Sequence, residues 1–182
     1  MHQVNFQLKH LYPADLGRLW ATLGRREYVE TKYHALGSTD LRILEFDVSA
    51  HTIFVVLERR VRNDVDAVPA WAKIILAGPH LLHHQTRWTR VDSKSAEVEV
   101  EIWPPGIPVR AQGRGVIVEL SAKRTEITLD FAVECHVPAV GAKVAEFFAD
   151  QMEQALDQDH RFTMSYLRRT MKSDPRDPAA SR

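Results

Sequence analysis

Histidine is the residue type in this chain best suited to chemistry, because its ring titrates near neutral pH and its nitrogens bind metals. The sequence holds nine histidines, and three of them stand close together as His80, His83 and His84. On a strand, His80 and His84 would share one face while His83 points the opposite way. A zinc site needs three or four converging ligands, and the sequence has neither an HExxH motif nor paired Cys and His spacing. We therefore predict no metal site and no other cofactor.

Polar residues that alternate in phase with apolar ones are stronger candidates for a site. His10 and Tyr12 continue one apolar series, and His84 and Thr86 precede Trp88 in another. A polar group on the inner face of a sheet must find a partner, which is another side chain, a buried water or a ligand. His84 and Thr86 could therefore bond to each other or to water, or orient a ligand in an otherwise apolar pocket.

The sequence offers no recognisable nucleophile. Cys135 is the single cysteine, so it cannot form an internal disulfide, and its place in an apolar alternation favours a packing role. No GxSxG or comparable signature occurs. We predict no catalytic residue from these patterns.

Three further polar residues have an undecided direction. Arg110, Gln112 and Arg114 share one face of a predicted strand, but Gly113 and Gly115 lie among them, where glycine favours a bulge and a change of register. If the three side chains point inward, a ligand carries an anionic head. If they point outward, they are ordinary solvated charges.

Composition narrows the class of protein. The chain has 182 residues, 45% hydrophobic and 26% charged, which is the usual mixture of one globular domain. Lys+Arg and Asp+Glu number 24 each, so no basic excess points to nucleic acid as a partner. No stretch approaches the roughly 18 apolar residues of a membrane span, and the first residues lack the apolar core of a signal peptide. We expect a cytoplasmic protein without integral membrane association, present as a monomer or a homodimer.

The elements that must position the candidate residues are mainly strands. Alternating or apolar stretches predict seven of them, at residues 2–12, 41–48, 52–61, 81–91, 96–103, 109–120 and 125–137. Two short helices are predicted after the first strand, one starting at Pro13 and one over 25–36. Segment 62–79 contains PAWAKIILA, which fits either a short helix or a lid. Residues 172–182 are expected to form a disordered polar tail after a single domain at 1–171.

The longest helical pattern runs from Pro138 to about Met171. Apolar residues recur along it at spacings of three and four, which predicts one stripe facing the sheet. The members of this stripe are Val140, Val144, Phe147, Phe148, Gln151 and Ala155. A curved antiparallel sheet closed by one long helix is the α+β architecture that we predict.

This order of elements resembles the helix-grip fold of the START and birch-pollen-allergen superfamily over residues 2–168. Local motifs also resemble a bacterial family within it, the domain of unknown function 2505. The motif residues are Tyr12-Pro13-Ala14, Trp20, Tyr28, Pro69, Lys73, Trp88, the run Val137–Lys143 and Phe147. The resemblance implies a pocket for lipids, sterols, polyketides or other apolar molecules between sheet and helix. It supplies no catalytic residues.

Our first functional hypothesis is a binding or carrier protein for a hydrophobic small molecule, whose apolar burial would supply most of the affinity. The alternatives are an enzyme of the same fold, a cyclase, hydrolase or dehydratase with His84 as general base, and a structural or interaction domain with a filled core. The predicted ligand-binding residues are His10, Tyr12, His84, Thr86, Trp88, Val144, Phe147, Phe148 and Gln151.

Overall fold

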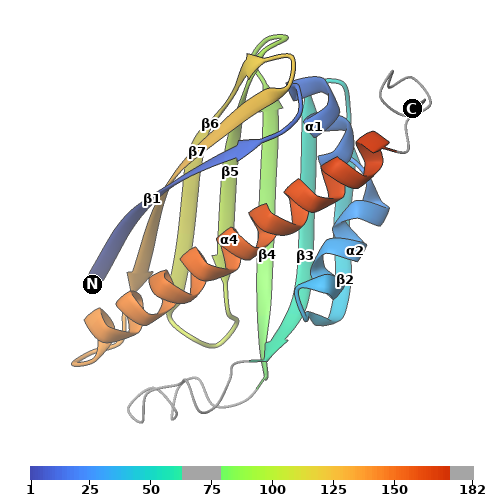
Figure 1. The fold of residues 1–182 in the computed structure, drawn as a ribbon. Coiled ribbons are helices and arrows are strands. Elements are labelled where there is room, and N and C mark those ends of the chain that lie inside the picture. Colours follow the sequence, from blue (N-terminus) through green and yellow to red (C-terminus); the bar gives the residue numbers. More distant parts are fainter. Residues whose placement is uncertain (63–78, 173–182) are drawn as a thin grey trace.

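The computed structural model describes residues 1–62 and 79–172, and these form one seven-stranded antiparallel sheet, two short helices and one long helix (Figure 1). The strands are β1 (His2–Tyr12), β2 (Thr39–Val48), β3 (Thr52–Arg62), β4 (Pro79–Arg90), β5 (Ser95–Trp103), β6 (Val109–Ser121) and β7 (Arg124–Cys135). The helices are α1 (Leu16–Leu23), α2 (Arg26–Ala35) and α4 (Gly141–Lys172). The predicted α+β helix-grip architecture is confirmed. The segment 62–79 that we considered as a lid lies, apart from its two end residues, outside the described residues, as does the predicted tail after Lys172.

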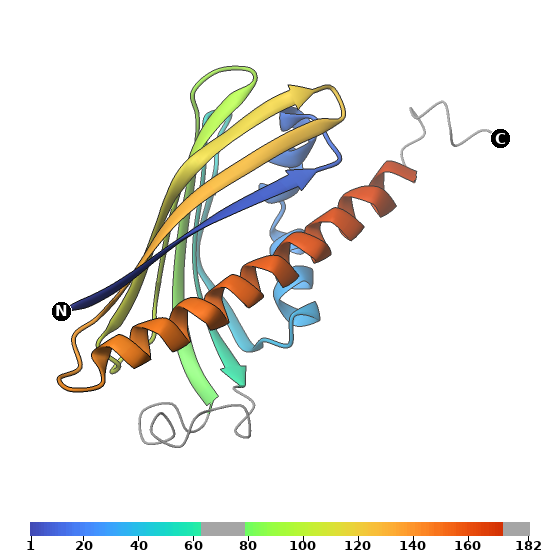
Figure 2. The same ribbon diagram turned by 60° about the vertical axis from the view of Figure 1, so that its left-hand side comes forward.

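The sheet is built from successive hairpins, and the first strand joins it at the far edge. Its order is β1-β7-β6-β5-β4-β3-β2, with every neighbouring pair antiparallel. The predicted hairpins β2–β3, β4–β5 and β6–β7 are all present. The strands curve strongly, so that one face of the sheet is concave (Figure 2).

Alternation in the sequence produces the inner face. In β7 every second residue is buried, and the outward residues between them are half-buried or exposed. The inward residues of β7 are Ile127, Leu129, Phe131, Val133 and Cys135. The same parity buries Val98 and Val100 in β5 while Glu97 and Glu99 remain exposed. The concave face is therefore the apolar side of the sheet.

The register of β6 is regular at its two glycines, so the predicted register change there is wrong. Residues Val109 to Glu119 pair without a shift against β7, and Gly113 and Gly115 both point toward the inner side. A Cβ on Gly115 would lie 1.9 Å from the carbonyl oxygen of Thr128, and one on Gly113 would lie 2.4 Å from the Phe131 ring. Gly115 is thus required because the backbone of β7 lies too close for a side chain, whereas Gly113 leaves room for the Phe131 ring, and no bulge is needed at either position.

The two short helices close one end of the concave face. α1 begins at Leu16 and not at Pro13, because Asp15 is its N-cap and its carboxylate accepts a hydrogen bond from the Arg18 amide at 2.7 Å. Leu16 and Leu19 are fully buried. α2 buries one face that includes a charged residue, Lys32, which becomes important for the site.

α4 crosses the open side of the curved sheet (Figures 1 and 2). It begins at Gly141, so the predicted start at Pro138 is three residues too early. Ala139 has φ of +64°, a left-handed conformation that a helix cannot contain, and residues 138–140 form a turn. Gly141 then lies against His2, where an added Cβ would be 2.8 Å from the His2 ring.

Two adjacent sides of α4 do different work. The helix packs mainly against β1 and β7 at one edge of the sheet. The fully packed stripe is made of Val144, Ala145, Ala149, Met152, Thr163 and Leu167. The predicted stripe shares Val144 with this packed one, and its members Val140 and Phe148 also pack against the core. Its members Gln151 and Ala155 are exposed, and with Phe147 and Phe148 they line the cavity described below. The predicted stripe therefore faces the sheet, but only part of it is packed tightly against the sheet.

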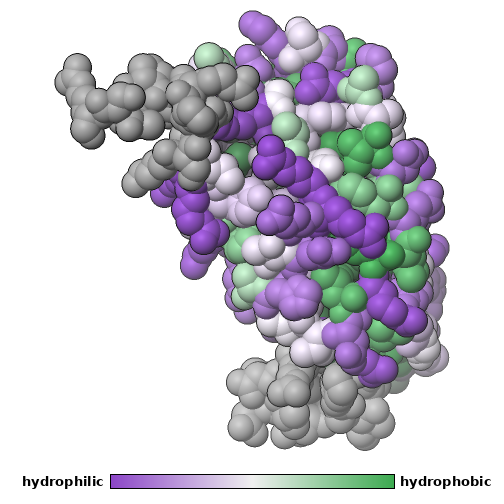
Figure 3. All heavy atoms as spheres, turned by 90° about the vertical axis from the view of Figure 1, so that its right-hand side faces the viewer, coloured by the Kyte–Doolittle hydropathy of each residue, from purple (hydrophilic) through white to green (hydrophobic). Residues whose placement is uncertain are grey.

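One outer face of the molecule is mostly polar. On the side that carries α2 and β2, hydrophilic side chains predominate and hydrophobic ones appear in interrupted groups between them (Figure 3). In residues 1–62 and 79–172, no helix is both long enough and apolar enough to cross a membrane.

Candidate functional site

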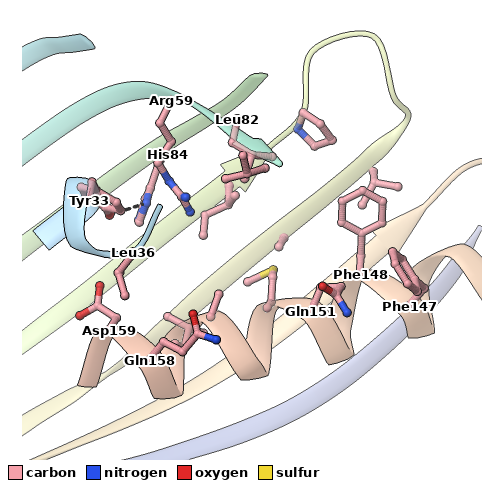
Figure 4. A pocket seen from close by; sticks show the side chains of 18 residues that line it. Tyr33, Leu36, Arg59, Leu82, His84, Phe147, Phe148, Gln151, Gln158 and Asp159 are labelled. Carbon is pink, nitrogen blue, oxygen red and sulfur yellow. Dashed lines mark hydrogen bonds between the residues drawn. The ribbon is translucent and has the colours of Figure 1, made fainter. Parts of the chain in front are cut away.

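A cavity of about 240 Å³ lies between the inner face of the sheet and α4 (Figure 4). The sheet side contributes Leu82, Ile102, Val109 and Ala111, and α4 contributes Phe147, Phe148, Met152 and Leu156. Gln151 and Ala155 also line it, and both are exposed, so the cavity opens to solvent along this side of α4. Most of the wall is apolar, as in small-molecule sites generally.

Polar residues gather at the end of the cavity nearest α2. His84, on the inner face of β4, has hydrogen bonds at both ring nitrogens. Its Nδ1 lies 2.9 Å from the hydroxyl of Tyr33, and its Nε2 lies 2.9 Å from the hydroxyl of Thr86. The bond between His84 and Thr86 is one of the two outcomes that the sequence left open.

His84 is a neutral imidazole at physiological pH. Burial lowers its pKa well below 6.5, and the positive charges of Arg59 and Lys32 lower it further. A neutral ring has one donor and one acceptor nitrogen, which suits a chain between two hydroxyl groups that can each donate or accept. The ring is therefore held in place on both sides.

A buried ion pair lies beside this chain. The ammonium of Lys32, with a side chain only 9% exposed, is 2.7 Å from Oδ2 of Asp159 on α4. The same ammonium lies 5.3 Å from the ring centre of Tyr28 and 4.8 Å from that of Tyr33. Asp159 also accepts from Thr163, whose hydroxyl bonds to that of Tyr28 at 2.6 Å, and burial raises the pKa of Tyr28 to about 12. α2 and α4 are thus tied together at the polar end of the cavity.

Arg59 also reaches this end of the cavity (Figure 4). It lies on β3 in the same alternation as the buried Ile53, Val55 and Leu57. Arg59 was not predicted as a site residue because it stands in the charged run Glu58-Arg59-Arg60, and such a run usually lies on a solvated face. The signal that could have found Arg59 is its parity with three inward apolar residues. Lys32 and Asp159 were missed as well, since each is a charged residue on a surface helix.

Four of the nine predicted ligand-binding residues line the cavity. They are His84, Phe147, Phe148 and Gln151. Thr86 stands behind His84, while Trp88 lies farther along β4 opposite Ile53, outside the lining. Val144 is fully buried in the packed stripe of α4. Ligand contact by any of these residues stays a prediction.

His10 and Tyr12 lie outside the cavity, in a separate cluster between β1 and α4. The His10 ring stacks on that of His160 at 4.1 Å between ring centres, and its Nε2 lies 2.9 Å from Asp157. His160 donates from Nε2 to the carbonyl of Leu11 at 2.8 Å, and Tyr12 meets the same ring edge-on. The inner-face parity of His10 and Tyr12 places them against the helix, where they attach it to β1.

The three undecided residues of β6 point outward. Arg110 is 3.0 Å from Glu101, Gln112 donates to the same carboxylate at 3.0 Å, and Arg114 is 3.7 Å from Glu99. All three side chains are exposed. They are solvated charges on the convex face and do not reach the cavity.

The histidines of β4 do not form a metal centre in the part of the chain that is described. His83 points away from His84 and pairs with Glu58 at 3.1 Å while stacking on Trp103. The side chain of His80 lies outside the described residues. Among the described side chains, no group of three or more His, Cys, Asp or Glu converges as metal ligands would.

The sequence matches the model of the family described as "Protein of unknown function (DUF2505)" over residues 7–167. The chain belongs to this family. No curated protein matches it. Its membership agrees with the resemblance noted from the Tyr12-Pro13-Ala14 and Val137–Lys143 motifs, and the fold of this member is the helix-grip fold.

Solved structures with the same fold cover almost the whole of this chain. The Zhui aromatase/cyclase from Streptomyces sp. R1128 is 14% identical, with a TM-score of 0.58 over 92% of this chain and 95% of that one. The protein TTHA0849 from Thermus thermophilus is 10% identical, with a TM-score of 0.62 over 92% and 99%. Norcoclaurine synthase from Thalictrum flavum, solved with dopamine and hydroxybenzaldehyde, is 12% identical, with a TM-score of 0.51 over 90% and 87%. At these identities the likeness shows the fold alone.

Proposed function

We propose that this protein binds or carries a hydrophobic small molecule in the cavity between the concave sheet and α4. The observation that carries the proposal is the cavity itself, about 240 Å³ with an apolar wall and one polar end. An apolar wall supplies affinity in proportion to the area that a ligand buries, at about 25 cal/mol per Å². A few placed polar groups then orient the ligand.

Structural neighbours support this proposal at the level of the fold. A neighbour of 12% identity was solved with the small aromatic molecules dopamine and hydroxybenzaldehyde, and another neighbour is an aromatase/cyclase. A filled core, the third hypothesis, is opposed by the cavity.

The contacts of His84 favour binding over turnover. A general base must offer a free lone pair to the substrate proton. Both ring nitrogens of His84 are already bonded, one to Tyr33 and one to Thr86, so this ring would have to release a hydroxyl before it could take a proton. We infer that His84 fixes the polar end of the cavity in one arrangement.

The test combines a blocked cavity with a matched control on the same helix. Ala155→Trp adds an indole at the cavity mouth, whereas Gln154→Trp adds one to an exposed neighbour that does not line the cavity. With the uncharged fluorescent probe N-phenyl-1-naphthylamine, we expect Ala155→Trp to weaken binding by about tenfold or more, a loss of about 1.4 kcal/mol, and Gln154→Trp to leave it unchanged.

Native mass spectrometry of protein purified from cells tests the same proposal without a chosen probe. A bound apolar molecule that Ala155→Trp removes would support it. The proposal is refuted if native mass spectrometry finds no bound molecule and the Ala155→Trp and Gln154→Trp variants bind the probe equally well.

A further inference from the structure

Arg59 places a positive charge inside the apolar cavity. Its side chain follows Ile53, Val55 and Leu57 on the inner face of β3, and its register partner Leu82 is another cavity residue. The close-up shows the guanidinium entering the cavity beside His84 (Figure 4). A cation at such a position is costly unless something balances it.

The contacts of Arg59 do not balance that charge. Nη1 donates to the hydroxyl of Ser38 at 3.1 Å, and the guanidinium lies 4.9 Å from the ring centre of Tyr33. Nε is buried and has no hydrogen-bond acceptor among the described residues. Within residues 1–62 and 79–172, no carboxylate forms an ion pair with Arg59, although Arg60 next to it pairs with Asp40 at 3.0 Å.

In the described part of the chain, the other ionisable groups at this end leave the charge of Arg59 uncompensated. Asp159 is matched by Lys32 at 2.7 Å. His84 is neutral, and Tyr33 keeps its proton because burial raises its pKa. Among the described residues, the polar end of the cavity therefore holds one cation in excess, while most of the remaining wall is apolar.

We propose that the cavity selects an amphipathic carboxylic acid, with its carboxylate at Arg59 and its apolar body along Leu82, Ile102, Phe148 and Met152. This inference rests on the proposed function, because it concerns the ligand of the same cavity. Arginine suits the role because its planar guanidinium matches the two oxygens of a carboxylate. Hydrogen bonds between ionised partners are also stronger than neutral ones, so the head group decides selectivity.

The experiment compares two ligands that differ only in the head. Decanoic acid and decanamide displace N-phenyl-1-naphthylamine at about pH 7.5, where the acid is ionised. We expect wild-type protein to bind the acid at least about tenfold more tightly than the amide. Arg59→Gln should bring this ratio close to one while the uncharged probe still binds.

Arg60→Gln is the matched control. It removes the same charge from the next residue, whose exposed side chain pairs with Asp40 on the outer side of the sheet. It should keep the acid preference of the wild type. Equal binding of acid and amide by the wild type, or an equal loss in both arginine variants, overturns the proposal even though the probe binds. Absence of probe binding to the wild type would instead overturn the proposed function and this inference together. If circular dichroism shows that Arg59→Gln does not fold, Arg59→Lys takes its place, with a ratio reduced but above one expected.

Discussion

Replacing Asp159 by Asn should destabilise the protein more than replacing its partner Lys32 by Met. The two side chains join α2 to α4 at 2.7 Å, and they are 25% and 9% exposed, respectively. Asn keeps an oxygen acceptor and almost the same volume but removes the negative charge. The Lys32 ammonium is then left buried without a charged partner.

The magnitude follows from these exposures. At 2.7 Å the attraction between the charges is about 6 kcal/mol with an effective dielectric constant of about 20. Most of it offsets the cost of removing both ions from water, so the pair itself adds little net stability. Leaving one charge buried and unmatched costs about 3–5 kcal/mol, and we expect about 3 kcal/mol because water reaches the Asp159 side of the pair. For a chain of this length that corresponds to a fall of about 6–12 °C in Tm.

The opposite single variant should be milder. Lys32→Met removes the deeply buried charge, and Asp159 can turn to the solvent on its exposed side, so we expect a loss of about 1–2 kcal/mol. The double variant leaves no charge and should lie within about 1 kcal/mol of the wild type. Urea unfolding at neutral pH, followed by circular dichroism, gives the four free energies of this double-mutant cycle. If Asp159→Asn lowers the free energy of unfolding by less than about 1 kcal/mol, the pair contributes no more than an exposed surface ion pair, and the argument for a buried pair is refuted.

Two further predictions follow from His84 and from the close approach of β6 and β7. Burial holds the pKa of His84 below 6.5, so the unfolded chain binds this proton more readily than the folded one, and the stability contributed by the ring is present above about pH 6.5 and is lost as the pH falls. Urea unfolding at several pH values should therefore show that the free energy of unfolding falls less with acid in His84→Gln than in the wild type. An equal pH dependence in the two proteins would contradict this. Gly115→Ala should cost about 3 kcal/mol or more of stability because its Cβ would lie 1.9 Å from the Thr128 carbonyl oxygen. Gly106→Ala, in open space with φ of +82°, should cost only about 1–2 kcal/mol. A larger fall in Tm for Gly106→Ala than for Gly115→Ala would contradict the packing argument.

Much of this fold could be predicted because alternation and turn composition act locally. The predicted bounds of β1 agree with the observed His2–Tyr12, and the other six strands differ by only one or two residues at most ends. The start of α4 was wrong because the left-handed conformation of Ala139 has no sequence signal comparable to a glycine. At Gly113 and Gly115 the residue type was informative, but a close strand approach and a bulge leave the same signature.

The candidate site was harder to predict because it depends on contacts between distant segments. His84 was found from its parity with apolar residues on one strand. Lys32 and Asp159 are 127 positions apart and each looks like an ordinary helix surface residue until the helices pack together. Arg59 was hidden among charged neighbours, although its parity was readable. The sequence suggested Arg110 as a possible partner for an anionic ligand, but its side chain points outward. The arginine that reaches the cavity is Arg59 on β3.

The two sides of α4 explain how one helix can both close the sheet and leave space beneath it. One stripe, with Val144, Ala149 and Leu167, is buried against the sheet, so it supplies the apolar burial that attaches the helix. The adjacent side, with Phe148 and Gln151, faces the cavity and gains less from packing. We therefore expect substitutions on the first side to act on folding and, under the proposed function, substitutions on the second side to act on ligand binding. This division makes a cavity compatible with a stable domain, because the residues that hold the helix in place are largely not those that would hold a ligand.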